Sequence, residues 1–109
     1  MEAKTTGAGG KAVTPLFPTG EVSVSRAALD LLTAVGVPPR LLIERHVSGD
    51  FGLVVGRAAQ ENLVAAKTGV RVLSRYALGE DGTGEVWVVT DKTRSRTMLF
   101  DPREYRRSL

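Results

Sequence analysis

Val86-Trp87-Val88-Val89-Thr90 is a run of β-branched and aromatic residues that predicts the strongest strand of this chain. Upstream, apolar and polar side chains alternate from Val70 to about Leu78, and the loop Gly79–Gly84 joins the two strands as a hairpin. Downstream, a turn over Asp91–Ser95 leads into a further strand over Arg96–Phe100. The three strands together predict an antiparallel meander.

Two or three helices are predicted before the meander, and each candidate is followed by a glycine that can end a helix. Ser25 is a good N-cap for the first helix, and Pro38-Pro39 suits the first turn of the second. In the second helix Leu42 and His46 are four residues apart and therefore share a face. The predicted helices span residues 26–35, about 38–47 and about 57–68, and Gly36, Gly49 and Gly69 follow them.

This order of elements predicts an α+β fold, in which N-terminal helices pack on a small antiparallel sheet of three to four strands. Glu21–Val24 alternates polar and apolar side chains and is an optional fourth strand, and Asp101-Pro102 can begin a short terminal helix. Helices have to cover one face of the sheet to bury Trp87 or its neighbours. We expect Trp87 itself to lie in the core.

One domain is expected over residues 19–109, because a chain of 109 residues supports one modest core. Residues 1–18 are rich in glycine, alanine, threonine and lysine, and they are expected to form a disordered N-terminal tail. The chain contains no cysteine, no stretch approaching the roughly 20 apolar residues of a membrane span and no secretory pattern. These features predict a cytoplasmic protein that is not embedded in a membrane.

The basic residues are biased toward arginine and toward the C-terminal half. The formal net charge is +3, and 11 of the 15 basic residues are arginine. Seven of these 11 lie between Arg71 and Arg107. Guanidinium groups favour bidentate contacts with phosphate and carboxylate, so RNA or DNA is one expected partner and an acidic protein is another. A solvated surface with interspersed acidic residues is the plain alternative.

The stretch Arg45–Gly52 holds the only histidine, close to a hydroxyl and a carboxylate. Metal-free cleavage of RNA needs groups that transfer protons and cations that stabilise the charged phosphorane. In this chain His46 and Glu61 could transfer the protons, and Arg75 and Arg94 could hold the phosphate. These four residues are the candidate catalytic set. No metal and no cofactor are expected, since one histidine with one nearby carboxylate is too few ligands for a convincing metal site.

Two other roles are open for the same region of sequence. A nucleic-acid-binding surface needs positive charge together with groups that stack or donate hydrogen bonds. The candidate binding residues are Arg75, Tyr76, Arg94, Ser95, Arg96 and Thr97. Alternatively, the loop Ser48, Gly49, Asp50, Phe51 and Gly52 is purely structural. In that case Asp50 accepts hydrogen bonds from local backbone amides, and His46 is a buried, hydrogen-bonded ring.

Several motifs follow one another in a recognisable order: Arg45-His46-Val47-Ser48-Gly49-Asp50-Phe51-Gly52, Glu61-Asn62, Gly69–Tyr76, Val86–Thr90, Arg94-Ser95-Arg96-Thr97 and Asp101–Tyr105. This pattern resembles a family of uncharacterised small proteins carried on bacterial plasmids, phages and other mobile elements. Phe51 stands where that family has tryptophan, and Asp91 stands where it has glutamate. More remotely, helices followed by an antiparallel sheet are similar to the fold of barnase, EndoU, colicin nucleases and RelE-like toxins.

Three functions therefore stay open. The resemblance implies an accessory protein of a mobile element, and the arginines suggest that it acts on or binds nucleic acid through an arginine-rich face. The second is a metal-independent, toxin-like endoribonuclease that uses His46 with Arg75 and Arg94. The third is a protein-interaction module with a purely structural loop over residues 46–50. The oligomeric state is left open by the sequence.

Overall fold

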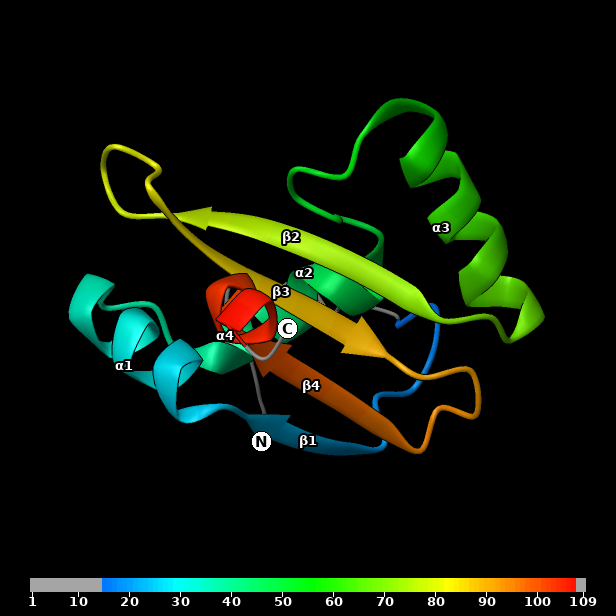
Figure 1. The fold of residues 1–109 in the computed structure, drawn as a ribbon. Helices are drawn as coiled ribbons and strands as arrows, with labels where there is room; N and C mark the ends of the chain where they lie inside the picture. Colours follow the sequence, from blue (N-terminus) through cyan, green and yellow to red (C-terminus); the bar gives the residue numbers. More distant parts are fainter. Residues whose placement is uncertain (1–14, 108–109) are drawn as a thin grey trace, which may run out of the picture.

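Four strands form one mixed sheet in the computed structural model, which describes residues 15–107 and the side chains of residues 15–104 (Figure 1). Strands β2 (Val72–Leu78), β3 (Gly84–Thr90) and β4 (Arg96–Phe100) are antiparallel, as predicted. Strand β1 (Glu21–Val24) is added at the outer side of β4 and runs parallel to it, which gives the order β1-β4-β3-β2. The α+β class is thus confirmed, but the sheet is not a pure antiparallel meander.

Local interactions explain where the helices begin and end. In α1 (Arg26–Val35), the Ser25 hydroxyl accepts a hydrogen bond from the Ala28 amide, and Gly36 adopts the left-handed conformation at the C-cap. Gly49 ends α2 in the same way, and Gly69 ends α3. The remaining helices are α2 (Pro39–Ser48), α3 (Gly56–Thr68) and α4 (Pro102–Arg107).

The helices are not all N-terminal, because α4 follows β4. The expected start at Asp101-Pro102 is confirmed, because α4 begins at Pro102. An Asp101 side-chain oxygen accepts a hydrogen bond from the Arg103 amide, and Glu104 accepts one from the Asp101 amide. The second bond is half of a capping box, and together the two bonds stabilise the first turn of so short a helix. Glu104 also accepts a hydrogen bond from the Ser25 hydroxyl at 2.7 Å, so the starts of α1 and α4 are tied together.

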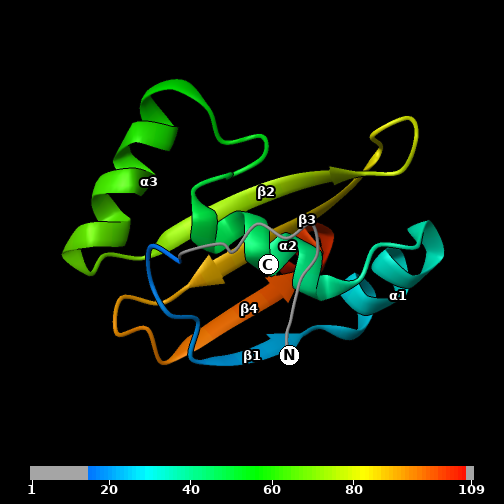
Figure 2. The same cartoon turned by 180° about the vertical axis from the view of Figure 1, so that it is seen from behind.

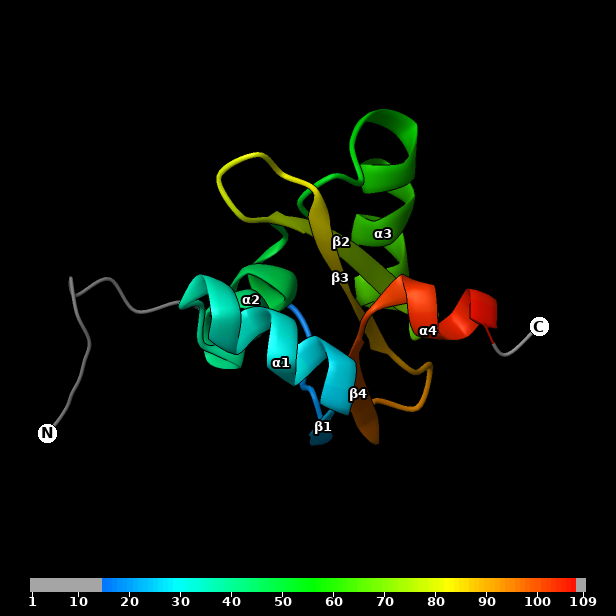
Figure 3. The ribbon, with the colours of Figure 1, turned by 60° about the vertical axis from the view of Figure 1, so that its left-hand side comes forward.

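The helices divide between the two faces of the sheet. Figure 3 shows α1 and α2 on one side of the strands and α4 on the other, while α3 lies along the β2 edge. Figure 2, which views the molecule from behind Figure 1, has α2 lying across the middle of the sheet. We call the side beneath α1 and α2 the covered face and the opposite side the open face.

Alternation along the strands assigns each side chain to one face. The covered face carries the core, which includes Val72, Tyr76, Leu78, Val86, Val88 and Leu99 together with Ala28, Leu32 and Leu42 of the helices. The open face carries Leu73, Arg75, Ala77, Glu85, Trp87, Val89, Arg96, Met98 and Phe100. The expectation that Trp87 lies in the core is therefore wrong: its neighbours Val86 and Val88 are buried, and Trp87 is half-buried on the opposite face.

Part of the predicted N-terminal tail belongs to the fold. Residues 1–14 of that tail lie outside the described residues, but residues 15–18 do not. The Leu16 amide donates a hydrogen bond to the Val47 carbonyl at 2.7 Å, and Phe17 is buried beside Val47 and Phe51. Burial of Phe17 thus holds residues 15–18 against the domain, although their composition and the flanking prolines predicted that they belong to the tail.

Candidate functional site

His46 lies inside the protein, between α2 and the covered face of the sheet. Its ring has no exposed surface, and the Phe17 ring packs edge-on against it with 5.2 Å between the ring centres. The Nδ1 atom lies 2.6 Å from the Ser74 hydroxyl, and the Nε2 atom lies 2.9 Å from the Thr90 hydroxyl. Both hydroxyl groups belong to fully buried residues of the sheet, so His46 joins α2 to β2 and β3.

The hydroxyl groups determine which ring nitrogen of His46 carries the proton. Thr97 donates its only hydroxyl proton to the Thr19 carbonyl, so in the 2.6 Å contact between Thr90 and Thr97 the proton comes from Thr90. Thr90 then has no proton left for His46, and Nε2–H must donate to Thr90. In a neutral ring Nδ1 is then an acceptor, and Ser74 donates to it. The chain of hydrogen bonds is satisfied from end to end by neutral His46 protonated on Nε2.

This environment is unfavourable for a catalytic histidine. Burial and, to a smaller extent, the positive charge of Arg94 lower the pKa of His46 from 6.5 to about 4, so the ring is neutral at physiological pH. Since no ring atom reaches the surface, a substrate phosphate cannot contact His46 in this structure. The ring instead completes a polar network within the core, where unsatisfied groups would be costly.

Arg94, the second candidate catalytic cation, also makes internal contacts. Its guanidinium donates hydrogen bonds to the carbonyls of Val70 and Asp91 at 2.8 and 2.9 Å, and to Ala65 and Ala66 at 2.8 and 3.4 Å. The last two carbonyls lie in the final turn of α3, where a positive charge is favoured by the helix dipole. Arg94 thus attaches the β3–β4 turn to the end of α3.

Glu61 and Arg75 lie on the other side of the sheet from His46. Both residues line a groove between α3 and β2, which has a volume of about 440 Å³. Of the four candidate catalytic residues, His46 is buried and Arg94 is half-buried and bonded to backbone carbonyls, whereas Glu61 and Arg75 line the groove. This structure does not bring them together around one position that a phosphate could occupy.

The loop after α2 is held by hydrogen bonds within the protein. Arg45 donates from Nε and Nη2 to the two carboxylate oxygens of Asp50, at 2.7 and 3.2 Å, and this bonding holds the pKa of Asp50 below its usual range. Asp50 also accepts a hydrogen bond from the Gly52 amide, the Asx-type arrangement expected from the sequence. Ser48 donates to the Arg45 carbonyl of its own helix, and Gly49 caps that helix. Phe51 is buried.

Three of the six candidate binding residues are turned inward. Tyr76 is fully buried, and its hydroxyl donates to the Asp50 carbonyl at 2.7 Å, so its ring does not offer a stacking surface. Thr97 belongs to the His46 network, and Arg94 binds α3. Ser95 is exposed but bonds to Asp91 within its turn, with an Oγ–Oδ2 distance of 2.8 Å. Of the six, Arg75 and Arg96 remain on the open face.

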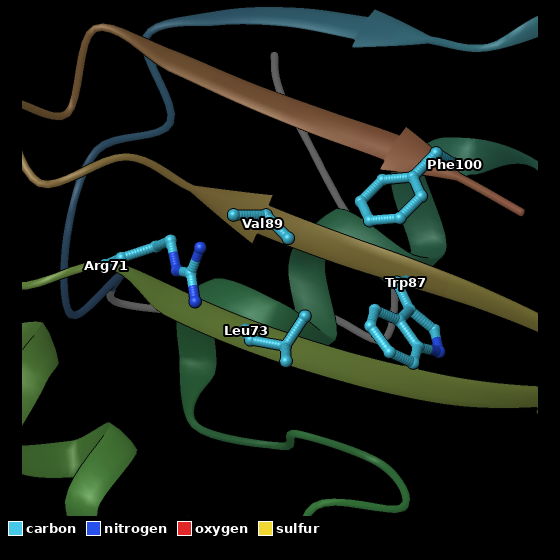
Figure 4. Close-up of a pocket in the computed structure, with 5 residues that line it drawn as sticks. All are labelled: Arg71, Leu73, Trp87, Val89 and Phe100. Carbon is cyan, nitrogen blue, oxygen red and sulfur yellow. The ribbon is translucent and has the colours of Figure 1, made fainter. Parts of the chain in front are cut away.

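The open face carries a shallow hollow that no sequence motif had indicated. It has a volume of about 240 Å³ and is lined by Arg71, Leu73, Trp87, Val89 and Phe100 (Figure 4). Trp87 and Phe100 are register partners on β3 and β4, with 5.9 Å between their ring centres and 60° between their planes. The hollow thus has an aromatic and aliphatic floor and a guanidinium at one end.

A carboxylate holds Trp87 and Arg75 in place on this face. Glu85 accepts hydrogen bonds from Arg75 Nε and Nη2, at 2.7 and 3.3 Å, and from the indole Nε1–H of Trp87. The Arg75 guanidinium lies 5.6 Å from the centre of the Trp87 ring, within the range of a cation–π interaction. Because Glu85 is paired with Arg75, the negative charge of its carboxylate beside the aromatic floor is neutralised.

These arrangements support binding at the open face better than catalysis at His46. Positive groups beside partly exposed aromatic rings can contact phosphates and stack on bases. In the sequence, this surface is indicated by the apolar residues that alternate with the core residues of the strands. They are Trp87 and Val89 on β3 and Leu73 on β2. Their face could not be recognised as open without knowing which face the helices cover.

Within residues 15–107 no helix is long and apolar enough to cross a membrane. In the same part of the chain no three histidine or acidic side chains are grouped so that they could hold a metal ion. Comparisons of this chain with known protein families, with curated proteins and with solved structures found no match.

Proposed function

We propose that this protein binds nucleic acid through the open face of its sheet and serves as an accessory protein of a mobile element. The observation that carries the binding function is the aromatic floor formed by Trp87 and Phe100 with Arg71 at its end. The role in a mobile element rests on the motif resemblance described above. The open face replaces the mixed set of binding residues expected from the sequence.

Charge on this face favours a polyanion. Arg71 and Arg96 are exposed, and both lie at the end of the sheet next to the β3–β4 turn. Glu85 lies on the same face but is paired with Arg75, and Glu21 lies opposite Arg96 on the neighbouring strand. The face therefore combines positive groups with stacking surfaces, as nucleic-acid-binding sheets do.

The first test measures the binding of fluorescently labelled RNA and DNA oligonucleotides by fluorescence anisotropy, at salt concentrations of about 50 and 200 mM. We expect affinity to fall steeply with salt, because phosphate contacts release counterions. Arg71→Ala and Arg96→Ala are each expected to weaken binding and to reduce the salt slope by about one unit.

The matched control is Arg40→Ala. Arg40 is an exposed arginine on α2, on the opposite side of the sheet, so its substitution removes the same charge away from the proposed interface. If Arg71→Ala and Arg96→Ala bind no more weakly than Arg40→Ala, the open face is not the binding surface. If no oligonucleotide binds, nucleic-acid binding is excluded, and binding of an acidic protein is the remaining function for this face.

A further inference from the structure

We infer that the open face takes a single strand rather than a duplex, with one base stacked on Trp87 and Phe100 and the adjoining phosphate at Arg71. This inference rests on the nucleic-acid binding proposed above and narrows its substrate class. It follows from the hollow on this face, from how Trp87 is held and from the position of Arg71 between two hollows.

The aromatic floor lies in a hollow of about 240 Å³ on the sheet and not on a protruding element. Figure 3 shows α3 beside the β2 edge and α4 on the open side of the sheet. A duplex presents sugars and phosphates on its outside, and its bases are read by elements that protrude into a groove. The floor of a hollow cannot enter a groove, whereas an unstacked base of a single strand can enter the hollow.

Trp87 is held in an orientation that suits stacking. Its indole N–H is bonded to Glu85, and Arg75 lies over the ring, so two contacts restrict its rotation. A ring that is already fixed loses little conformational entropy when a base stacks on it.

Arg71 lies between two adjoining hollows. Arg71 and Leu73 line both the aromatic hollow and the groove between α3 and β2. A strand with one base on Trp87 would therefore pass its phosphate near Arg71 and place its next nucleotide toward the groove. Glu61 lines that groove and would repel a phosphate, but its carboxylate can accept hydrogen bonds from base amino groups. The groove is thus suited to a base and Arg71 to the phosphate.

The single tryptophan makes this arrangement directly measurable. Trp87 is the only tryptophan in the chain, so its intrinsic fluorescence reports on the aromatic hollow alone. The experiment titrates the full chain with a 12-nucleotide single strand, with the matching 12-base-pair duplex and with an abasic strand of equal length. The abasic strand keeps every phosphate but removes the stacking groups.

We expect the single strand to quench Trp87 and to bind about tenfold or more tightly than either the duplex or the abasic strand. Trp87→Ala should weaken single-strand binding by a similar factor. Leu41→Ala is the control, because Leu41 is an exposed apolar residue on α2. If Trp87→Ala fails to fold, the comparison between normal and abasic strands on the unaltered chain still tests the inference.

The outcomes separate this inference from the proposed function. Suppose that duplex and single strand bind equally tightly, that Trp87 fluorescence is not quenched and that Arg71→Ala still weakens binding. That result overturns the inference, but the proposed nucleic-acid binding stands. Equal binding of normal and abasic strands likewise overturns it, because stacking then contributes nothing. Absence of binding to all three probes overturns both.

Discussion

His46 and Thr90 are 44 residues apart in sequence, yet the Nε2 atom of one lies 2.9 Å from the hydroxyl of the other, with both side chains fully buried. The hydrogen bonds that end at the Thr19 carbonyl require a proton on Nε2 of His46. Burial lowers the pKa of His46 to about 4, so the ring is neutral and Nδ1 accepts from Ser74. A histidine that was a catalytic candidate in the sequence thus connects α2, three strands of the sheet and the segment before β1.

The tautomer can be observed directly. Long-range ¹H–¹⁵N spectra of the histidine ring distinguish a protonated Nε2 from a protonated Nδ1. We expect a protonated Nε2 at pH 7, because the Thr90 hydroxyl has already donated its proton to Thr97. A protonated Nδ1 would mean that the donors run in the opposite direction, and the derived network would be wrong.

Stability is expected to fall as the pH is lowered from about 6.5 to about 4. The folded-state pKa of His46 is about 4 and its ordinary value is 6.5, so between these values the unfolded chain binds more protons than the folded one. His46 therefore contributes its full stability above pH 6.5, and about 3 kcal/mol is lost on acidification to pH 4. Urea unfolding at several pH values measures this slope.

The control for this slope is His46→Asn, which cannot titrate. Its free energy of unfolding should be nearly independent of pH between about 6.5 and 4.5, a range above the ordinary carboxylate pKa values. Direct NMR titration of the ring in the unaltered protein provides a second measurement. A His46 pKa near 6.5 would contradict the buried environment described here.

Thr90→Val is expected to destabilise the protein by about 1–3 kcal/mol. Valine has nearly the shape of threonine but leaves the Nε2–H of His46 without an acceptor and Thr97 without a donor. Thr90→Ser keeps the hydroxyl and should cost less than Thr90→Val. Equal losses for the two variants would show that packing, and not the hydrogen bonds, accounts for the effect.

Arg94→Ala is expected to lower the free energy of unfolding by about 1–3 kcal/mol, because it removes the guanidinium hydrogen bonds that hold the β3–β4 turn to Val70 and to the end of α3. Arg96→Ala removes an exposed arginine and should change stability by less than about 0.5 kcal/mol. Thermal or urea unfolding of both variants, combined with the oligonucleotide titration, separates the two arginines. We expect Arg94 to affect stability and Arg96 to affect binding; the reverse result would reassign both residues.

Gly52→Ala is expected to cost more than about 2 kcal/mol of stability. Gly52 has a φ of +68°, and a β-carbon there would lie 2.0 Å from the Arg75 carbonyl oxygen. Gly56 has a similar φ of +62°, but a β-carbon there would meet no heavy atom within 4 Å. Gly56→Ala therefore incurs only the backbone strain, about 1 kcal/mol. Equal losses for the two variants would contradict the close approach of the loop to β2.

Local chemistry explains which elements the sequence could predict. Helix α1 spans Arg26–Val35 as expected, because Ser25 and Gly36 form its caps with groups only a few residues away. Strand β4 spans Arg96–Phe100 and β1 spans Glu21–Val24, also as expected. The parallel pairing of β1 with β4 could not be predicted in the same way. It depends on how the three helices and two strands between them pack in space.

The sequence by itself therefore determined the positions and types of the elements, since capping, alternation and helical periodicity are properties of neighbouring residues. Only the tertiary structure decided which side of β3 would be covered, because both Val88 and Trp87 are apolar and either could face a helix. The tertiary structure also brings the Arg94 guanidinium to the Ala65 carbonyl, 29 residues away in sequence, and it buries His46. Burial and long-range hydrogen bonding depend on packing between distant segments, and this packing moved the candidate site from His46 to the open face.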